Sequence, residues 1–314
     1  MSSLSGNNST LFTFILMGIP RLEAEHSWLS IPFSSIYLVS LVGNCTILFD
    51  IKTDSSLHEP MYYFLPMLAI TDLGLSLSTM PTVLKIFWLN SREIGFEACF
   101  VQLWFVHTFS FIESSVLLAM AFDRYVAICK PLRYASILTN ARIAMIGLAI
   151  LGRSTFLPLP LVLMLRRLPF CKSHVLSHPY CLHQDLMRLA CSTLHFSLPY
   201  GLVLVSLIMI LDPLLILVSY ALIFKTILGI ASLKEHLKAL NNCLSHIFAV
   251  LALYIPMIGL SVVYRFGHHA SPMVHILMAN IYLLVPPVLN PIVYSIKTKQ
   301  IRKGIARVFV LRKM

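Results

Sequence analysis

Residues 197–224 read SLPYGLVLVSLIMILDPLLILVSYALIF, an apolar stretch with a single charged residue, Asp212. An α-helix needs about 20 mainly apolar residues to cross the hydrocarbon layer of a bilayer, so this stretch is long enough to span it. The whole chain of 314 residues has the same character, because 58% of its residues are hydrophobic and only 12% are charged. Soluble domains have about 25% charged residues. The composition therefore excludes most soluble folds and indicates a protein that crosses the membrane several times.

Six further apolar stretches alternate with segments that hold the charged and turn-forming residues. The predicted spans are 28–51, 61–87, 99–122, 143–165, 197–224, 244–264 and 273–296. We therefore expect an all-α membrane protein, a bundle of seven transmembrane helices in a domain 28–296, preceded by a segment 1–27. The tail 297–314 mixes apolar and basic residues at helical spacing, which predicts a short amphipathic helix on the cytoplasmic membrane surface.

The basic residues predict the direction of insertion. Of the 24 Lys and Arg residues, fifteen lie in one set of connecting segments and the tail, seven lie in the opposite set, and Lys85 and Arg153 lie within spans. Because Lys and Arg of short loops stay on the cytoplasmic side, we expect the N-terminus outside and the C-terminus in the cytoplasm. Overlapping glycosylation sequons at Asn7 and Asn8 agree with this direction, and no cleavable signal peptide is evident. The net charge of +11 thus reflects topology, and nucleic acid is not expected as a partner.

Four of the seven cysteines fall on the predicted outer side, where they can pair in three ways. They are Cys99, at the start of the third span, and Cys171, Cys181 and Cys191, in the long segment between the fourth and fifth spans. A disulfide bond from Cys99 to this segment would hold it over the bundle as a lid. A structural zinc site is disfavoured because the chain has no CxxC pair. The remaining cysteines, which we expect to be free thiols, are Cys45, Cys129 and Cys243.

Polar residues inside the predicted spans are costly, at roughly 2.5–3.5 kcal/mol for a charged side chain, so each needs a partner or a role. Asn44, Asp72, Glu113 and Asn290 lie at comparable mid-bundle depth in four different spans, and Asp212 is a further carboxylate. The first four residues offer oxygen atoms for a small cation such as sodium, or for a shared proton. The alternative is a hydrogen-bonded polar core with neutral carboxyl groups.

A second polar group is predicted beneath the lid. His107 and Ser110 share a face of the third span, and Ser261 and Arg265 share a face at the outer end of the sixth. Gln184 lies in the predicted lid itself. These side chains are expected to form one cluster. The alternative for Arg265 is a side chain that reaches the lipid headgroups, and the alternative for His107 is a hydrogen-bonded core histidine.

Six motifs resemble, in order, the signatures of olfactory receptors, a branch of the rhodopsin-like G-protein-coupled receptors. The most specific is MAFDRYVAIC at 120–129, which ends the third span. The others are Gly43-Asn44, LHEPMYYFL at 57–65, Ser219-Tyr220, KALNNCLSH at 238–246 and PPVLNPIVY at 286–294. The runs 181–185 and 259–267 resemble the class I, fish-like group. Amine receptors place an aspartate where this chain has Val106, so amine ligands are disfavoured.

The resemblance implies an odorant receptor, not an enzyme, without catalytic residues or a cofactor other than a bound sodium ion or proton. Class I receptors are associated with polar odorants such as carboxylic acids, and the guanidinium of Arg265 can grip a carboxylate through two parallel hydrogen bonds. The expected ligand-binding residues are His107, Ser110, Phe111, Leu161, Gln184, Val205, Tyr254, Ser261 and Arg265. The residues expected to act in activation and G-protein coupling are Asp123, Arg124, Tyr125, Tyr220, Lys238, His246, Pro291 and Tyr294.

The implied partner is a stimulatory G protein that raises cyclic AMP, and the implied location is the plasma membrane, in the cilia of olfactory neurons. The same receptor used outside the nose as a metabolite sensor is an alternative that the sequence does not separate from olfaction. A small-solute transporter or channel would also explain seven spans and buried carboxylates. It predicts internal repeats and paired broken helices, and the two halves of the chain show no self-similarity.

Overall fold

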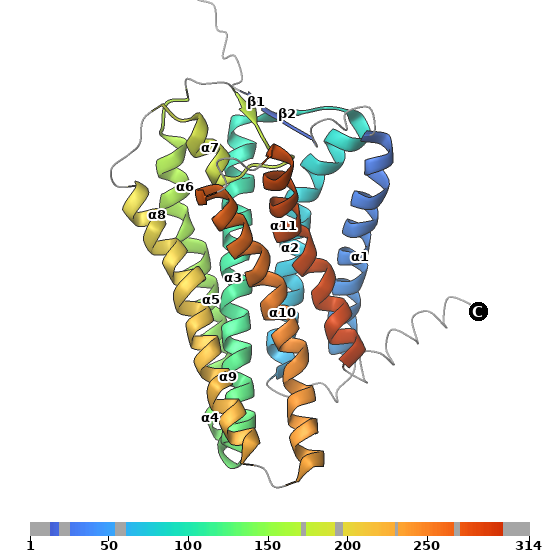
Figure 1. Ribbon diagram of the computed structural model, residues 1–314, viewed down its shortest axis with the longest axis vertical. Coiled ribbons are helices and arrows are strands. Elements are labelled where there is room, and N and C mark those ends of the chain that lie inside the picture. The colour runs from blue at the N-terminus through green and yellow to red at the C-terminus, as the bar shows by residue number, and fades with distance from the viewer. Residues whose placement is uncertain are drawn as a thin grey trace, which may run out of the picture.

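The computed structural model describes residues 13–18, 26–53, 61–170, 174–191, 197–229, 232–266 and 271–297. Seven helical spans, each long and apolar enough to cross a membrane, run alongside one another as a bundle (Figure 1). Five are the single helices α1 (His26–Thr53), α2 (Met61–Leu89), α3 (Phe96–Cys129), α10 (Leu233–Phe266) and α11 (Pro272–Lys297). The other two are built from α5 (Asn140–Phe156) with α6 (Pro158–Arg166), and from α8 (Ser197–Ser206), η4 (Leu207–Leu211) and α9 (Asp212–Leu228). The predicted seven-helix membrane fold is confirmed.

A proline lies at the break in each of the two composite spans. The fourth span breaks at Leu157, and Pro158 begins α6, because a proline in a helix removes a hydrogen bond and clashes with the preceding turn. In the fifth span, the π-helix η4 lies directly before Asp212 and Pro213. Such wider turns often occur at functional sites. α10, by contrast, continues through Pro256.

α3 occupies the centre of the bundle. In its most apolar window 67% of the residues are buried, against 22% for both the first and the fifth spans. The outer helices expose large apolar side chains such as Leu148, Leu217 and Trp28. Because water would penalise this much apolar surface, the outer face of the bundle suits lipid.

Several helices extend beyond their predicted boundaries. α3 continues to Cys129 instead of 122, and α10 begins at Leu233 instead of 244. These extensions carry Arg, Lys and Glu, which the hydropathy pattern excludes from a membrane span but which are good helix formers. A helix can therefore continue beyond the hydrocarbon layer.

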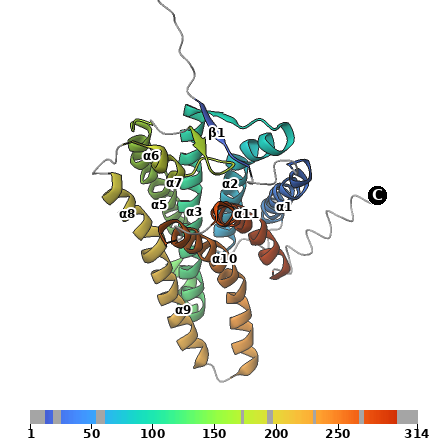
Figure 2. The ribbon, with the colours of Figure 1, turned by 45° about the horizontal axis from the view of Figure 1, so that its top comes forward.

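A small sheet and a short helix cover one end of the bundle, which we call the lid end. The strand β1 (Thr13–Leu16) pairs antiparallel with β2 (Glu93–Gly95) and parallel with β3 (Val175–Leu176). Figure 2 shows this end, with β1 and the short helix α7 (His183–Leu189) above the bundle near α3. Phe14 and Leu16 of β1 are buried against the bundle. The sequence pattern gave no indication of this sheet.

The opposite end, which we call the loop end, contains the short helices η3 (Pro131–Arg133) and α4 (Tyr134–Ile137). The predicted sequons at Asn7 and Asn8 and most of the predicted amphipathic tail, residues 298–314, lie outside the described residues.

Candidate ligand-binding cavity

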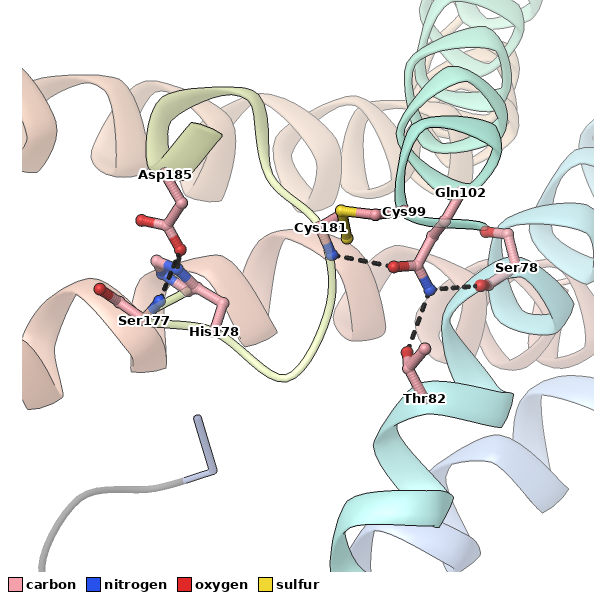
Figure 3. The surroundings of a disulfide bond; sticks show 8 residues. All are labelled: Ser78, Thr82, Cys99, Gln102, Ser177, His178, Cys181 and Asp185. Atoms are coloured by element: carbon pink, nitrogen blue, oxygen red, sulfur yellow. Dashed lines mark hydrogen bonds and ion pairs between the residues drawn. A yellow bond between two sulfur atoms is a disulfide. The ribbon is translucent and has the colours of Figure 1, made fainter. Parts of the chain in front are cut away.

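A disulfide bond and a glutamine side chain attach the lid to the bundle (Figure 3). Cys99, near the start of α3, is bonded to Cys181, with 5.5 Å between their Cα atoms. Three residues further along α3, Gln102 accepts a hydrogen bond from the backbone N–H of Cys181 at 2.9 Å. The amide nitrogen of Gln102 donates to the carbonyl oxygen of Ser78 at 2.8 Å and to the hydroxyl of Thr82 at 3.0 Å. The segment before α7 is therefore fixed to both α2 and α3.

The remaining cysteines fall into two groups. Cys191 is also disulfide-bonded, and its partner lies outside the described residues. Cys171 itself lies outside the described residues. Cys45, Cys129 and Cys243 are free, as expected.

A buried carboxylate joins the lid to α10. Asp185 of α7 is 2% exposed, and its side chain lies 2.5 Å from the Nδ1 atom of His178. The carboxylate also accepts hydrogen bonds from the backbone N–H of Ser177 at 3.0 Å and from the hydroxyl of Tyr264 at 3.3 Å. The guanidinium of Arg188 lies over the ring of Tyr264, 4.8 Å from its centre. We call Ser177, His178, Asp185 and Tyr264 the lid latch.

A cavity of about 290 Å³ lies beneath the lid, between α3, α6, α7, α8, η4, α10 and α11. Its wall is mainly apolar. The polar side chains in the wall are His107, His183, Gln184, Ser261, Tyr264 and Tyr282. A mainly apolar cavity with a few convergent polar groups is the usual form of a small-molecule binding site.

Two histidines in this wall have unmade hydrogen bonds. The rings of His107 on α3 and His183 on α7 lie 5.8 Å apart, edge to face. Within the described part of the chain, the Nε2 atom of His107 and the Nδ1 atom of His183 are buried without a hydrogen-bond partner. Burial lowers the pKa of His183 from 6.5 to about 4, so its imidazole is neutral at neutral pH. A buried polar group without a partner costs free energy that a hydrogen-bonding ligand would recover.

The structure brings most of the predicted ligand-binding residues to this cavity. Those in its wall are His107, Phe111, Leu161, Gln184, Val205 and Ser261. Ser110 and Tyr254 do not line it; Tyr282 donates a hydrogen bond to Ser110 at 2.8 Å, and the hydroxyl of Tyr254 pairs with that of Ser114 at 2.9 Å. Arg265 lies in α10, but its side chain is outside the described residues. Its role in binding stays a prediction.

Sequence reasoning missed His183 and Tyr264, although both lie next to residues that it singled out. His183 precedes Gln184, and Tyr264 precedes Arg265. A histidine and a tyrosine in such positions carry no periodic signal, and only the folded lid places them on the cavity wall.

Asp72, Glu113 and Asp212, the carboxylates singled out within the predicted spans, form two separate groups. The amide nitrogen of Asn290 lies 3.1 Å and 3.2 Å from the carboxylate oxygens of Asp72 and 3.5 Å from Glu113. The Oε2 atom of Glu113 and the Oδ1 atom of Asn290 are buried without partners among the described residues. The amide nitrogen of Asn44, which was predicted to join this set, donates to the backbone carbonyl groups of Ser40 and Pro287, each at 2.9 Å, and its amide oxygen is buried without a partner among the described residues.

The second group is an ion pair that the sequence did not predict. Arg153 on α5 contacts both carboxylate oxygens of Asp212 on α9, at 2.9 Å and 3.0 Å. Ser114 of α3 donates to the same carboxylate at 2.7 Å, and the hydroxyl of Ser115 accepts from Arg153 at 3.3 Å. Asp212 is 1% exposed, so this pair ties three helices together inside the bundle.

A third histidine, at the loop end, has a partner for each ring nitrogen. The Nε2 atom of His246 lies 2.9 Å from the carbonyl oxygen of Leu117, and its Nδ1 atom lies 2.7 Å from the hydroxyl of Tyr220. Because a carbonyl oxygen only accepts, Nε2 carries the hydrogen and Nδ1 accepts from Tyr220. His246 of α10 is thus joined to α3 and α9.

Other residues predicted for activation lie at the same end. Asp123 accepts a hydrogen bond from Tyr134 at 2.7 Å, and the Nε atom of Arg124 has no partner in the described ranges. The rest of the set is Tyr125, which is half-buried, Pro291 and Tyr294, which are buried, and Lys238, whose side chain lies outside the described residues. Their roles in coupling stay predictions.

Residues 33–312 match the protein family described as olfactory receptor. Olfactory receptor 51G2 of Homo sapiens is 59% identical over 310 residues, which cover 98% of this chain and 99% of that receptor. Olfactory receptor 51Q1 of Homo sapiens is 56% identical over 314 residues, which cover 100% of this chain and 99% of that receptor. The crystal structure of squid rhodopsin has a TM-score of 0.75 at 17% identity, over 95% of this chain and 91% of that chain, and shows the fold alone.

The family match covers nearly the whole chain, including every helix that forms the cavity and the loop end. Olfactory receptors are not enzymes, and the family implies an odorant as ligand and a G protein as partner. With seven membrane-spanning helices, a lidded cavity and relatives of this identity, the chain belongs to the olfactory receptor family of G-protein-coupled receptors.

Proposed function

We propose that this receptor binds a small carboxylic acid in the cavity under the lid and activates a stimulatory G protein that raises cyclic AMP. The observation that supports the ligand class is the pair of histidines, His107 and His183, which line a mainly apolar cavity and each have a buried nitrogen atom without a partner among the described residues. A ligand with a hydrogen-bonding head and an aliphatic tail fits a wall that combines these histidines with many apolar side chains.

The acid head lies at the histidines, and its charge is balanced by Arg265. A neutral imidazole donates a hydrogen bond to a carboxylate but supplies no charge, so the histidines alone do not offset the cost of burying the anion. Arg265 follows Ser261 by one helical turn on α10, and Ser261 lines the cavity. A guanidinium at this turn supplies the charge and two parallel hydrogen bonds.

The aliphatic tail extends along the apolar wall, which includes Phe111, Leu161 and Val205. Apolar pockets discriminate between ligands by size, so this wall sets the preferred chain length.

Binding is coupled to signalling through α10. An agonist activates only if it binds the active arrangement better than the resting one. An acid that contacts His107 on α3, His183 on α7 and Arg265 on α10 pulls the lid end of α10 inward. The same helix carries His246 at the loop end, where its bonds to α3 and α9 must rearrange for a cleft to open toward the G protein.

The uneven distribution of Lys and Arg supports a plasma-membrane orientation with the lid outside, the loop end in the cytoplasm and the tail 297–314 on the inner surface. The family implies the cilia of olfactory neurons. We also assign the pocket of Asp72, Glu113 and Asn290 to a sodium ion or a proton, because it gathers two carboxylates and an unpartnered amide oxygen.

The test is a cyclic AMP assay in cells that display the receptor. Wild type, Arg265→Ala and Arg265→Lys are compared with Arg167→Ala, an exposed arginine at the end of α6 that serves as the matched control. The ligands are straight-chain acids from acetic to dodecanoic acid and their methyl esters, with surface expression measured for each variant.

We expect acids but not esters to activate wild type and Arg167→Ala. Arg265→Ala should lose the response, and Arg265→Lys should keep part of it, because a lysine retains the charge but not the planar fork. Equal activation by esters, or a normal response of Arg265→Ala, would show that the ligand is not held as a carboxylate.

A further inference from the structure

The ligand cavity shares part of its wall with a groove on the outer surface of the bundle. The groove lies between the fifth span, at α8 and η4, and α10. Four residues line both spaces: Leu202, Val205, Met209 and Ser261. The outer rim of the groove is formed by Ser206, Ile210, Ile258 and Val262. All four rim residues belong to membrane spans, so the groove opens toward lipid.

The shared wall is only one side chain thick. Leu202 and Val205 line the cavity, yet they are 45% and 40% exposed on the outer surface. On the opposite wall, Leu103, Val106 and Leu161 are 0%, 3% and 6% exposed. The cavity is therefore deeply enclosed on the α3 and α6 side and barely separated from the bilayer on the α8 and α10 side.

The described part of the lid is held to the bundle at several points. The disulfide bond Cys99–Cys181 and Gln102 fix the lid to α3, and the lid latch fixes it to α10. Leu182 and Leu186, at the start and in the middle of this lid, are 5% and 0% exposed. A ligand arriving from water through this described part of the lid would have to break these contacts.

The contact that closes the thin wall is weak. Met209, in the π-helix η4, accepts a hydrogen bond from the hydroxyl of Ser261 at a distance of 3.4 Å. A thioether is a poor acceptor, and a methionine side chain has three rotatable bonds. Rotation of the Met209 side chain would break this contact without unfolding either helix.

We propose that ligands enter the cavity sideways, from the lipid leaflet at the lid end, through a portal between α8–η4 and α10 that is gated by Met209 and Ser261. The ligand class that uses it is an amphiphile that dissolves in the bilayer, with an apolar tail and one hydrogen-bonding head. That this ligand is the odorant rests on the proposed function, but the route itself does not, and it can be tested without an agonist.

The experiment measures how fast a thiol inside the cavity is labelled from lipid and from water. Val106→Cys places it on the enclosed wall, with Leu161→Cys as a second position. Receptor in lipid nanodiscs is treated with a pyrene maleimide, which partitions into the bilayer, or a sulfonated maleimide, which stays in water. Peptide mass spectrometry reads the label at the introduced position alone, and rates are divided by those toward glutathione in solution.

Ser206→Trp plugs the portal from its outer rim, and Val203→Trp is the matched control. Val203 lies on the same helix, is 56% exposed and lines neither the cavity nor the groove. We expect the lipid-soluble reagent to label the cavity thiol faster than the water-confined one. Ser206→Trp should slow that labelling by about tenfold while Val203→Trp leaves it unchanged, because a blocked route changes an association rate.

If the sulfonated reagent labels as fast as the pyrene reagent at both positions, or if the two tryptophan variants behave alike, the portal is not the route. Neither result depends on whether carboxylic acids activate the receptor. A receptor that is labelled through the portal but ignores every acid would overturn the proposed ligand class and leave the route standing.

Discussion

Buried histidines at the loop end and in the cavity wall at the lid end differ in how their ring nitrogens are paired. At the loop end, both ring nitrogens of His246 have partners, and the side chain joins three helices. At the lid end, His107 and His183 each have a buried nitrogen without a partner in the described residues, and both line a cavity. A satisfied buried polar group stabilises the fold, whereas an unsatisfied one lowers stability until a ligand binds it. The contrast distinguishes a structural joint from a binding site.

The ion pair between Arg153 and Asp212 is a second structural joint, in which the buried carboxylate is bound by Arg153 and Ser114. Asp212→Ala leaves a guanidinium without its counter-charge inside the membrane, so we expect a loss of about 3–5 kcal/mol of stability. Thermal unfolding in nanodiscs and surface expression measure this loss. The double variant Arg153→Met, Asp212→Leu should recover most of the lost stability. If Asp212→Ala is as stable as wild type, the ion pair is not a structural joint.

His246→Phe should have the next largest effect on stability. It leaves the carbonyl of Leu117 and the hydroxyl of Tyr220 without their bonds, at a cost of about 1–3 kcal/mol. Tyr220→Phe provides the control. Because the two side chains share a hydrogen bond, the double variant should lose less free energy of unfolding than the two single variants lose together. If the two changes in the free energy of unfolding are strictly additive, the pair is not coupled.

His183→Phe should behave in the opposite way. It removes an unpartnered nitrogen and no hydrogen bond within the described chain, so thermal stability should stay close to that of wild type. Under the proposed function, the potency of an activating acid should fall by roughly tenfold or more, because a hydrogen bond to a charged ligand is lost. Concentration–response curves check the potency. A drop in stability as large as that of His246→Phe would mean that both histidines are structural.

The smallest effect concerns pH. The pKa of His183 lies at about 4 in the folded receptor and near 6.5 in an unfolded chain. Above pH 6.5 the His183 side chain is neutral in both the folded and the unfolded state, so it has no effect on how stability depends on pH. As the pH falls from 6.5 toward 4, the unfolded state binds a proton that the folded state does not, and stability declines. Wild type should therefore lose more thermal stability than His183→Phe between pH 7 and pH 4.5. Parallel losses would contradict the buried, neutral state.

The seven spans were predictable because hydrophobicity over about 20 residues is a property of local sequence. The signature at 120–129, which contains Arg124, indicated the family because it too is a property of local sequence. Most of the cavity wall was also predictable once the resemblance was known, including His107, Gln184 and Ser261.

What could not be predicted depends on contacts between distant segments. β1 is a four-residue strand whose partners lie beyond α2 and beyond α6. Arg153 and Asp212 meet only because α5 and α9 pack on the same side of α3. Ser110 faces a neighbouring tyrosine and not the cavity, because helical spacing gives a face but not the side chain that occupies it.

The most direct test of the central claim alters the volume of the cavity. Gly201 of α8 lines it, and a Cβ atom there would lie 3.5 Å from Leu161, which is an ordinary contact. We expect the larger side chain of Gly201→Leu to extend into the cavity and fill space meant for the ligand tail. The cyclic AMP response to straight-chain acids is measured for this variant and for wild type. If the acid binds in this cavity, the preferred chain length becomes shorter while methyl esters stay inactive. An unchanged preference at full surface expression would show that the ligand binds elsewhere.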